Sequence, residues 1–161
     1  MSSDRISRRA AALGLLALGG CGFAPVYSDG SALRGLVTFQ TDETVAGYRL
    51  RERLEQRLGV SQNARYELRV ALSQNSQPAA ITAAGDTVRF NVVGRADWSL
   101  RAIATGQIAA EGKSESFTSY AATGTTVATQ AASTDANARL SIALADMIVS
   151  RLLILSNDLS Q

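Results

Sequence analysis

The chain has 161 residues, of which 46% are hydrophobic and 19% charged, so its composition favours one packed domain and excludes wholesale disorder. Its cations are 15 Arg and a single Lys, and it has no His, which removes the commonest metal ligand and the usual base of hydrolytic triads. One Cys can form neither an intrachain disulfide nor a thiolate metal cluster. The composition therefore argues against an enzyme.

Residues 1–20 have the pattern of a bacterial lipoprotein signal peptide. Arg5, Arg8 and Arg9 form a basic start, and residues 10–18 form an apolar run that is far shorter than the ~20 residues needed to cross a bilayer. We expect export, with the general secretory and twin-arginine routes both left open.

The only cysteine follows this signal directly. Leu18-Gly19-Gly20-Cys21 resembles a bacterial lipobox, in which cleavage occurs before the Cys and both its thiol and its new amine are acylated. Several acyl chains make membrane attachment stable, whereas one does not. The alternative, a small buried cysteine, is poor because no core element begins after Cys21. We therefore expect no cofactor beyond the covalent S-diacylglycerol and N-acyl lipid on Cys21, and Gly22 in place of Asp favours the outer membrane.

Removal of residues 1–20 would leave a chain without net charge. Three Arg and Asp4 are lost, so thirteen cationic and thirteen anionic side chains remain. This balance argues against nucleic acid as a partner. We expect residues 21–32 to form an acylated tether, residues 33–156 a single α+β domain, and residues 157–161 a flexible tail.

The first half of the predicted domain contains a strand, a helix and a second strand. Residues 33–40 predict a short strand, and the i, i+4 spacing of leucines in residues 45–58 predicts a helix that ends at Gly59. In residues 66–73 the apolar side chains alternate with polar ones, which indicates a half-buried strand. Residues 74–86, which include Pro78 and Gly85, are polar and predict a loop.

The second half predicts a long hairpin followed by a helix. In residues 88–102 apolar and polar side chains alternate over a length that is unusual for one straight strand, which favours a bend at Gly94. A turn at Thr105-Gly106 then leads to a strand over residues 107–120 in which this alternation is weaker. Residues 121–132 fit either a mobile loop or the start of a helix. A helix is expected over residues 134–155, with a core stripe of Leu140, Leu144, Ile148 and Leu152 joined by Met147 and Leu155.

The order β-α-β-β-β-α predicts the fold class α+β. We expect a two-layer sandwich, in which two helices pack on one face of a mostly antiparallel four-stranded sheet. The other face of that sheet would carry the charged side chains of the strands and point toward water or a partner.

The sequence offers few groups for catalysis. Glu111 and Glu115 could act as paired carboxylates, but cross-strand salt bridges to Arg95 or Arg101 are the plainer role. No glycine-rich phosphate-binding loop is present in the sequence. The remaining candidate is the basic sheet face, since guanidinium groups bind phosphate in a bidentate manner. We predict contact with a phosphorylated lipid headgroup or an acidic partner through Arg89, Arg95, Arg101 and Lys113, against the alternative of a plain solvated surface.

Four segments together resemble the LPS-assembly lipoprotein family of Gram-negative outer membranes, in its alphaproteobacterial form. They are the opening Cys21-Gly22-Phe23-Ala24-Pro25-Val26-Tyr27, residues 64–68, residues 94–100 and the helix over residues 138–153 with its LADMIVSRL sequence. The opening is similar to the family's Cys-Gly-Phe-x-Pro-Val/Leu-Tyr motif. The resemblance covers nearly the whole mature chain and implies two helices on a four-stranded sheet.

The resemblance implies a non-enzymatic function at the outer membrane. A lipoprotein of this family plugs the lumen of the large β-barrel that inserts LPS, helps that barrel to assemble, and has LPS as a further ligand. The implied partners are that barrel, LPS and the membrane that holds the lipid anchor, with the domain facing the periplasm and the barrel lumen. The alternative is a periplasm-facing, lipid-binding lipoprotein that serves another envelope lipid transporter.

Overall fold

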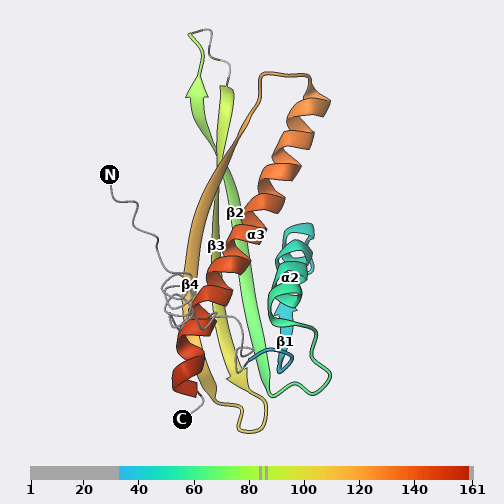
Figure 1. Cartoon of the computed structure of the whole chain (residues 1–161). Helices are drawn as coiled ribbons and strands as arrows, with labels where there is room; N and C mark the ends of the chain where they lie inside the picture. Colours follow the sequence, from blue (N-terminus) through green and yellow to red (C-terminus); the bar gives the residue numbers. More distant parts are fainter. Residues whose placement is uncertain (1–32, 84, 86, 160–161) are drawn as a thin grey trace, which may run out of the picture. The chain divides into compact units, whose positions relative to one another are not determined.

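The structure, a computed structural model, describes residues 33–83, 85 and 87–159. The predicted signal peptide, Cys21 and the tether lie outside these residues. The elements occur in the predicted order (Figure 1): β1 Val37–Thr41, α2 Val45–Leu58, β2 Tyr66–Ile81, β3 Thr87–Ala102, β4 Ile108–Ala121 and α3 Thr126–Leu159.

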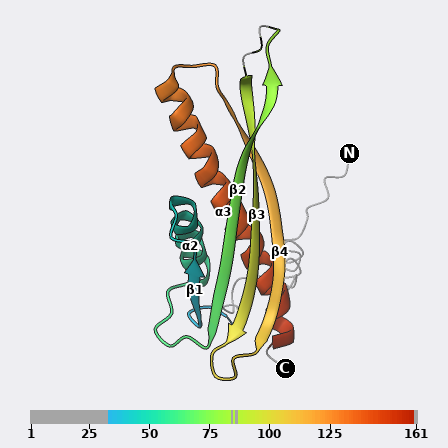
Figure 2. The same ribbon diagram turned by 180° about the vertical axis from the view of Figure 1, so that it is seen from behind.

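The four strands form one mixed sheet in the order β1-β2-β3-β4. β1 is parallel to β2, because α2 carries the chain back between them, and the other two pairs are antiparallel. Both helices cover the same face, and the opposite face is seen without a covering helix in Figure 2. The structure confirms the predicted α+β sandwich.

Local signals in the sequence set the limits of α2. The Thr44 hydroxyl accepts a hydrogen bond from the Gly47 amide at 3.0 Å, which caps the start of the helix. At the other end Gly59 has a φ of 80° and donates its amide to the Glu55 carbonyl at 2.8 Å. The prediction of a helix over residues 45–58 is confirmed, whereas residues 33–36 form a turn and not the start of the first strand.

The prediction of a loop over residues 74–86 was wrong for residues 74–81, since β2 continues to Ile81 and pairs with β3, with register shifts between Pro78 and Ile81. The alternation fades because the inward positions 74 and 76 hold Gln and Ser. Pro78 was one of the signals for a loop, but its missing N–H lies on the side of β2 where no described strand pairs. A proline costs no ladder hydrogen bond at such a position.

The long hairpin of β3 and β4 runs through Gly94 without a register shift, with Gln74 and Ser116 as its neighbours on the two adjacent strands. Gly94 instead lies under α3. A Cβ built on Gly94 would come within 2.8 Å of Leu140 Cδ2 and 3.0 Å of Leu144 Cδ1. Glycine at this position therefore lets the helix pack directly on the strand backbone.

Helix α3 begins earlier and ends later than predicted. Of the two alternatives for residues 121–132, the structure has a short loop followed by helix from Thr126, and the Thr125 hydroxyl accepts from the Ala128 amide at 3.3 Å. The predicted core stripe is confirmed at Leu140, Leu144, Ile148 and Leu152, but Met147 is 41% exposed. Within the described range no helix is long and apolar enough to cross a membrane.

Candidate interaction surface

The four predicted contact residues all lie on strands β3 and β4, with Arg89, Arg95 and Arg101 on β3 and Lys113 on β4. The buried residues of β3 are Val92, Gly94, Ala96, Trp98 and Leu100, so the arginines alternate with them and point to the outer face. The sheet therefore presents these cations on the face that α2 and α3 leave uncovered.

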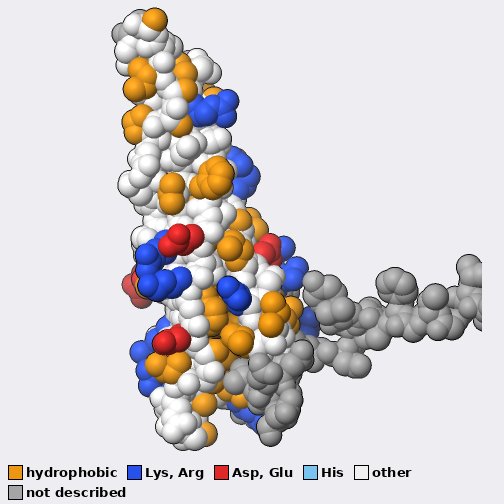
Figure 3. Space-filling view, turned by 90° about the vertical axis from the view of Figure 1, so that its left-hand side faces the viewer, with side chains coloured by type: hydrophobic (Ala, Val, Ile, Leu, Met, Phe, Trp, Pro, Cys, Tyr) orange, Lys and Arg blue, Asp and Glu red, His pale blue; other side chains and the backbone are white. Residues whose placement is uncertain are grey.

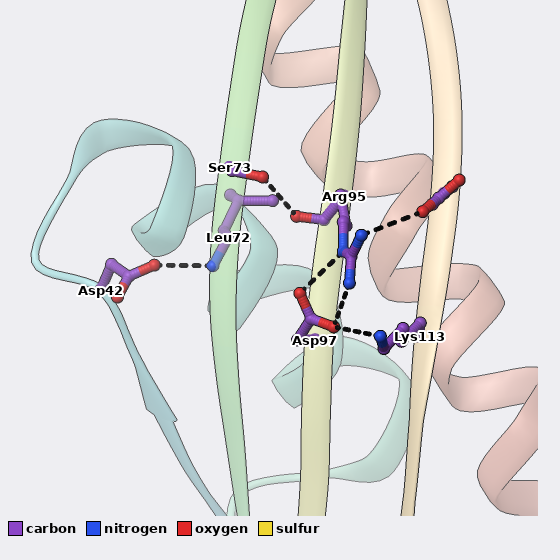
Figure 4. Close-up of polar contacts among 7 residues, drawn as sticks. Asp42, Leu72, Ser73, Arg95, Asp97 and Lys113 are labelled. Carbon is purple, nitrogen blue, oxygen red and sulfur yellow. Dashed lines mark hydrogen bonds and ion pairs between the residues drawn. The ribbon is translucent and has the colours of Figure 1, made fainter.

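Arg95 is the centre of an ion-pair cluster on this face (Figure 4). Its guanidinium binds both oxygens of Asp97, at 2.9 and 3.1 Å, and lies 3.6 Å from Glu115 Oε1. Lys113 Nζ lies 4.0 Å from the same Asp97 carboxylate. The hydrogen bond from Arg95 lowers the pKa of Asp97, and the same hydrogen bond raises the pKa of Arg95. Two cations and two carboxylates thus neutralise one another.

The sheet register explains this cluster. Arg95 stands opposite Glu115, and Asp97 stands opposite Lys113. The salt-bridge role predicted for Glu115 toward Arg95 is confirmed by the structure. Glu111, in contrast, stands opposite Ser99 and not Arg101.

The other two arginines lie at separate places along β3. Arg101 Nη1 donates to the Gly106 carbonyl at 2.6 Å in the β3–β4 turn, and Arg89 Nη1 lies 3.4 Å from the Ser119 hydroxyl. Each is six residues from Arg95, or about 20 Å along a strand. The structure therefore brings Arg95 and Lys113 together and places Arg89 and Arg101 apart from them. Among the residues described, Arg89 has no ion pair.

A shallow hollow of about 400 Å³ lies beside the ion-pair cluster. Small residues of three neighbouring strands form its floor, and side chains of both charges form its rim. The floor includes Ala71, Ser99 and Gly112, and the rim includes Arg69, Asp97, Glu111 and Lys113. The sequence could not reveal this hollow, because its small residues become neighbours only through the strand register.

An apolar pair lies farther along the same face. Phe117 stands opposite Val93, and their side chains are 72% and 44% exposed. Both interrupt the polar alternation of their strands, a signal that could have been read from the sequence. Figure 3 looks at the side of the molecule that lies on the left in Figure 1; acidic side chains appear there from the middle of the view downward, and the upper part carries apolar and uncharged side chains with a few cations.

A larger groove lies on the helical side of the sheet, between the start of α2, the first turns of α3 and β2. Its volume is about 1210 Å³. Its two charged residues are each paired on their own helix, Arg49 with Glu52 at 3.0 Å and Asp135 with Arg139 at 2.8 Å. The remaining lining is apolar or neutral and includes Val45, Ala46, Gln74, Val127, Ala131 and Thr134. Sequence reasoning missed this groove because it left residues 121–132 without an assigned structure.

Within the described part of the chain, no group of three or more His, Cys, Asp or Glu residues is placed to hold a metal ion. Cys21, the predicted lipidation site, lies outside these residues. What the structure offers is a set of candidate surfaces: an outer face with a charge-balanced centre, an exposed apolar pair and a neutral groove.

The fold is similar to that of solved bacterial lipoproteins. A lipoprotein candidate from Caulobacter crescentus matches with a TM-score of 0.62 and 28% identity over 76% of this chain and 93% of that chain. Rare lipoprotein B from Shewanella oneidensis matches with a TM-score of 0.61 and 16% identity, over 78% of this chain and 97% of that chain. A minor lipoprotein from Acinetobacter baumannii matches with a TM-score of 0.55 and 12% identity, over 73% of this chain and 88% of that chain. No family model matches the chain, and no curated protein is significantly similar to it.

Proposed function

We propose that this chain is an outer-membrane lipoprotein that occupies the lumen of the LPS-inserting β-barrel and helps it to assemble. In this proposal Cys21 carries the lipid anchor, LPS is a further ligand, and the chain catalyses no reaction. The observation that carries the proposal is the similarity of its fold to rare lipoprotein B and the Caulobacter lipoprotein candidate.

Two features of the chain support this role. The lipobox ending in Cys21 would tether the domain to a membrane through several acyl chains. The central part of the outer face carries charges that pair with one another, at Arg95, Asp97, Lys113 and Glu115. A surface whose charges are already paired can be enclosed by a partner at a lower desolvation cost than one with isolated charges.

Affinity purification of the acylated full chain tests the proposal against its alternative. We expect a large outer-membrane β-barrel protein to co-purify in stoichiometric amount. Recovery of an inner-membrane lipid-transporter complex in its place would contradict the proposal and favour the periplasm-facing lipid-binding role. A Cys21→Ala variant is the matched control for lipidation, and we expect mass spectrometry to find no acyl chain on it.

LPS contact through the outer face has a test of its own. We expect replacement of Arg89, Arg95 and Arg101 together by Gln to weaken LPS binding by the purified chain. A variant with Arg34, Arg51 and Arg151 changed to Gln loses the same charge elsewhere and serves as the control. Equal binding by both variants would show that the outer face is not the headgroup site.

A further inference from the structure

Strand β2 has an open edge beyond the end of β1. β1 pairs with β2 only as far as Val70, and the next edge amide, that of Leu72, donates to the Asp42 carboxylate at 2.7 Å (Figure 4). From there to Ile81, no described strand lies on this side of β2. Asp42 therefore ends the paired part of the edge.

The alternation of the backbone shows which groups face this edge. The amides of Tyr66 and Leu72 both point to the β1 side, toward the Leu36 carbonyl at 3.0 Å and toward Asp42. Successive residues of a strand point their N–H and C=O groups to opposite sides. The N–H and C=O groups of Gln74 and Ser76 therefore point to the open edge as well. Pro78 is the next residue with this orientation. It has no N–H to donate, so the stretch of edge that can pair through its amides ends there.

This edge borders the neutral groove between α2 and α3. Gln74 belongs to both, and its side-chain amide donates to the Asn137 carbonyl at 3.2 Å and to the Ser141 hydroxyl at 3.1 Å. These hydrogen bonds hold β2 against α3 at the floor of the groove. Val45 at the start of α2 and Val127 at the start of α3 are 74% and 80% exposed. Two large apolar side chains thus lie uncovered beside a free strand edge.

We propose that an extended peptide segment of a partner polypeptide binds here as an added strand. It would pair with the backbone of Gln74 and Ser76, continue the line of β1, and place an apolar side chain in the groove near Val127. Main-chain hydrogen bonds supply affinity in this mode of recognition, and a pocket for alternate side chains supplies specificity. This inference goes beyond the proposed function and does not depend on which protein supplies the segment.

The chemistry of the site favours a peptide over a lipid. An acyl chain could fill the apolar part of the groove, but it offers no hydrogen bonds to the N–H and C=O groups of the edge. A phosphate headgroup has no free cation to bind in the groove, since Arg49 already pairs with Glu52. The ends of the edge at Asp42 and Pro78 restrict pairing to about four residues of the peptide.

The test uses the full chain, purified from membranes into lipid nanodiscs, and a random linear peptide library displayed on phage as the probe. Selected peptides are synthesised and their binding is measured by fluorescence anisotropy. Two variant pairs separate backbone pairing from side-chain effects. Ser76→Pro removes the edge N–H and Ser76→Ala keeps it, while Val127→Asp places a charge in the groove and Phe117→Asp places one on the outer face.

We expect Ser76→Pro and Val127→Asp each to weaken peptide binding at least tenfold, and both control variants to stay within twofold of the unchanged chain. Methylation of alternate peptide amides should weaken binding as strongly as Ser76→Pro. Circular dichroism reports whether each variant folds. If Ser76→Pro does not fold, Val127→Asp and the methylated peptides decide the question, since neither alters the backbone of β2.

Three results would overturn the inference. The first is that no selected peptide binds the unchanged chain more tightly than it binds the Val127→Asp variant. The second is binding of a fluorescent fatty acid that Val127→Asp abolishes, together with no binding of any peptide. This result would assign the groove to lipid. The third is a dimer of the chain that Val127→Asp dissociates, which would assign the groove to a second copy.

Discussion

Gly94 of β3 lies directly beneath Leu140 of α3, so close that a Cβ on Gly94 would reach within 2.8 Å of Leu140 Cδ2. Leu140 and Leu144 are both buried at this crossing. The absence of one side chain on the strand therefore sets how closely the long helix approaches the sheet. The ladder passes through Gly94 with no change of register.

Substitution of Gly94 by Ala should destabilise the fold. The new methyl group would force Leu140 or the helix to shift, and overpacking of this kind costs about 1–3 kcal/mol. The backbone entropy gained by replacing Gly is smaller, at ~1 kcal/mol or less. Urea denaturation should show the loss, whereas Val93→Thr on the outer face should change stability by less than ~0.5 kcal/mol. Unchanged stability of Gly94→Ala would mean that α3 does not pack this closely.

The two helices are joined by a bidentate ion pair, which a double-mutant cycle can measure. Arg53 of α2 donates to both carboxylate oxygens of Asp146 of α3 at 3.0 Å, and this hydrogen bonding raises the pKa of Arg53. We expect Arg53→Gln and Asp146→Asn each to lower Tm by a few degrees, and the double variant to lose less than their sum. Arg49→Gln, which breaks an exposed pair within α2, is the control. Strict additivity would argue against the pair.

Stability should fall in acid partly through Asp97. Its pKa is lowered in the folded chain, chiefly by the hydrogen bond from Arg95, so the unfolded chain binds the proton more readily. The contribution of ionised Asp97 to the free energy of unfolding is therefore fully present above the ordinary Asp pKa of about 4. It is lost as the pH falls through the lower pKa of the folded chain. Asp97→Asn should be less stable than the unchanged chain at pH 7, and the difference should shrink toward pH 2.

The control for this measurement is Glu43→Gln, because Glu43 makes no ion pair among the described residues. Its difference from the unchanged chain should vary less with pH than that of Asp97→Asn. The measurement is the denaturant midpoint of each variant between pH 2 and pH 7. If the midpoints of Asp97→Asn and of the unchanged chain change in parallel with pH, Asp97 makes no pH-dependent contribution to stability.

Proline scanning of β2 should distinguish its open edge from its paired side. Asn75 stands opposite Val93 and its amide faces β3, so Asn75→Pro breaks a ladder hydrogen bond and leaves a partner unsatisfied, at a cost of about 1–3 kcal/mol. Ser76→Pro loses an amide that faces the open edge and should cost distinctly less. Thermal unfolding of the two variants gives the comparison, and an equal loss would show that the orientation of β2 is assigned wrongly.

The elements that the sequence predicted well are those whose apolar pattern is set by burial. The leucines of α2 and the stripe from Leu140 to Leu152 have helical spacing because they cover the sheet, and β3 alternates because one of its faces is covered. The predictions that failed or were left open concern the ends of elements. Residues 74–81 and 126–133 lie where the core thins, so their patterns are weak and only pairing or helix continuation determines their structure.

The candidate surfaces were less accessible to sequence reasoning. Alternation placed Arg89, Arg95 and Arg101 correctly on one face, but it could not show that Asp97 and Glu115 hold Arg95 while Arg89 lacks an acidic partner in the described chain. Those pairings depend on which residue of β4 stands opposite each residue of β3. The β3–β4 turn determines that register, and a shift by one residue would change every pair.

By itself, the sequence determined the number, type and order of the elements and the face of each that is buried, because these follow from local periodicity and capping. It also predicted the lipid anchor at Cys21, which the described residues do not test. Only the tertiary structure decided the ion-pair cluster, the approach of α3 to Gly94, the open edge of β2 and the neutral groove beside it. Each of these joins residues far apart in the chain, and such contacts arise from strand register and helix packing.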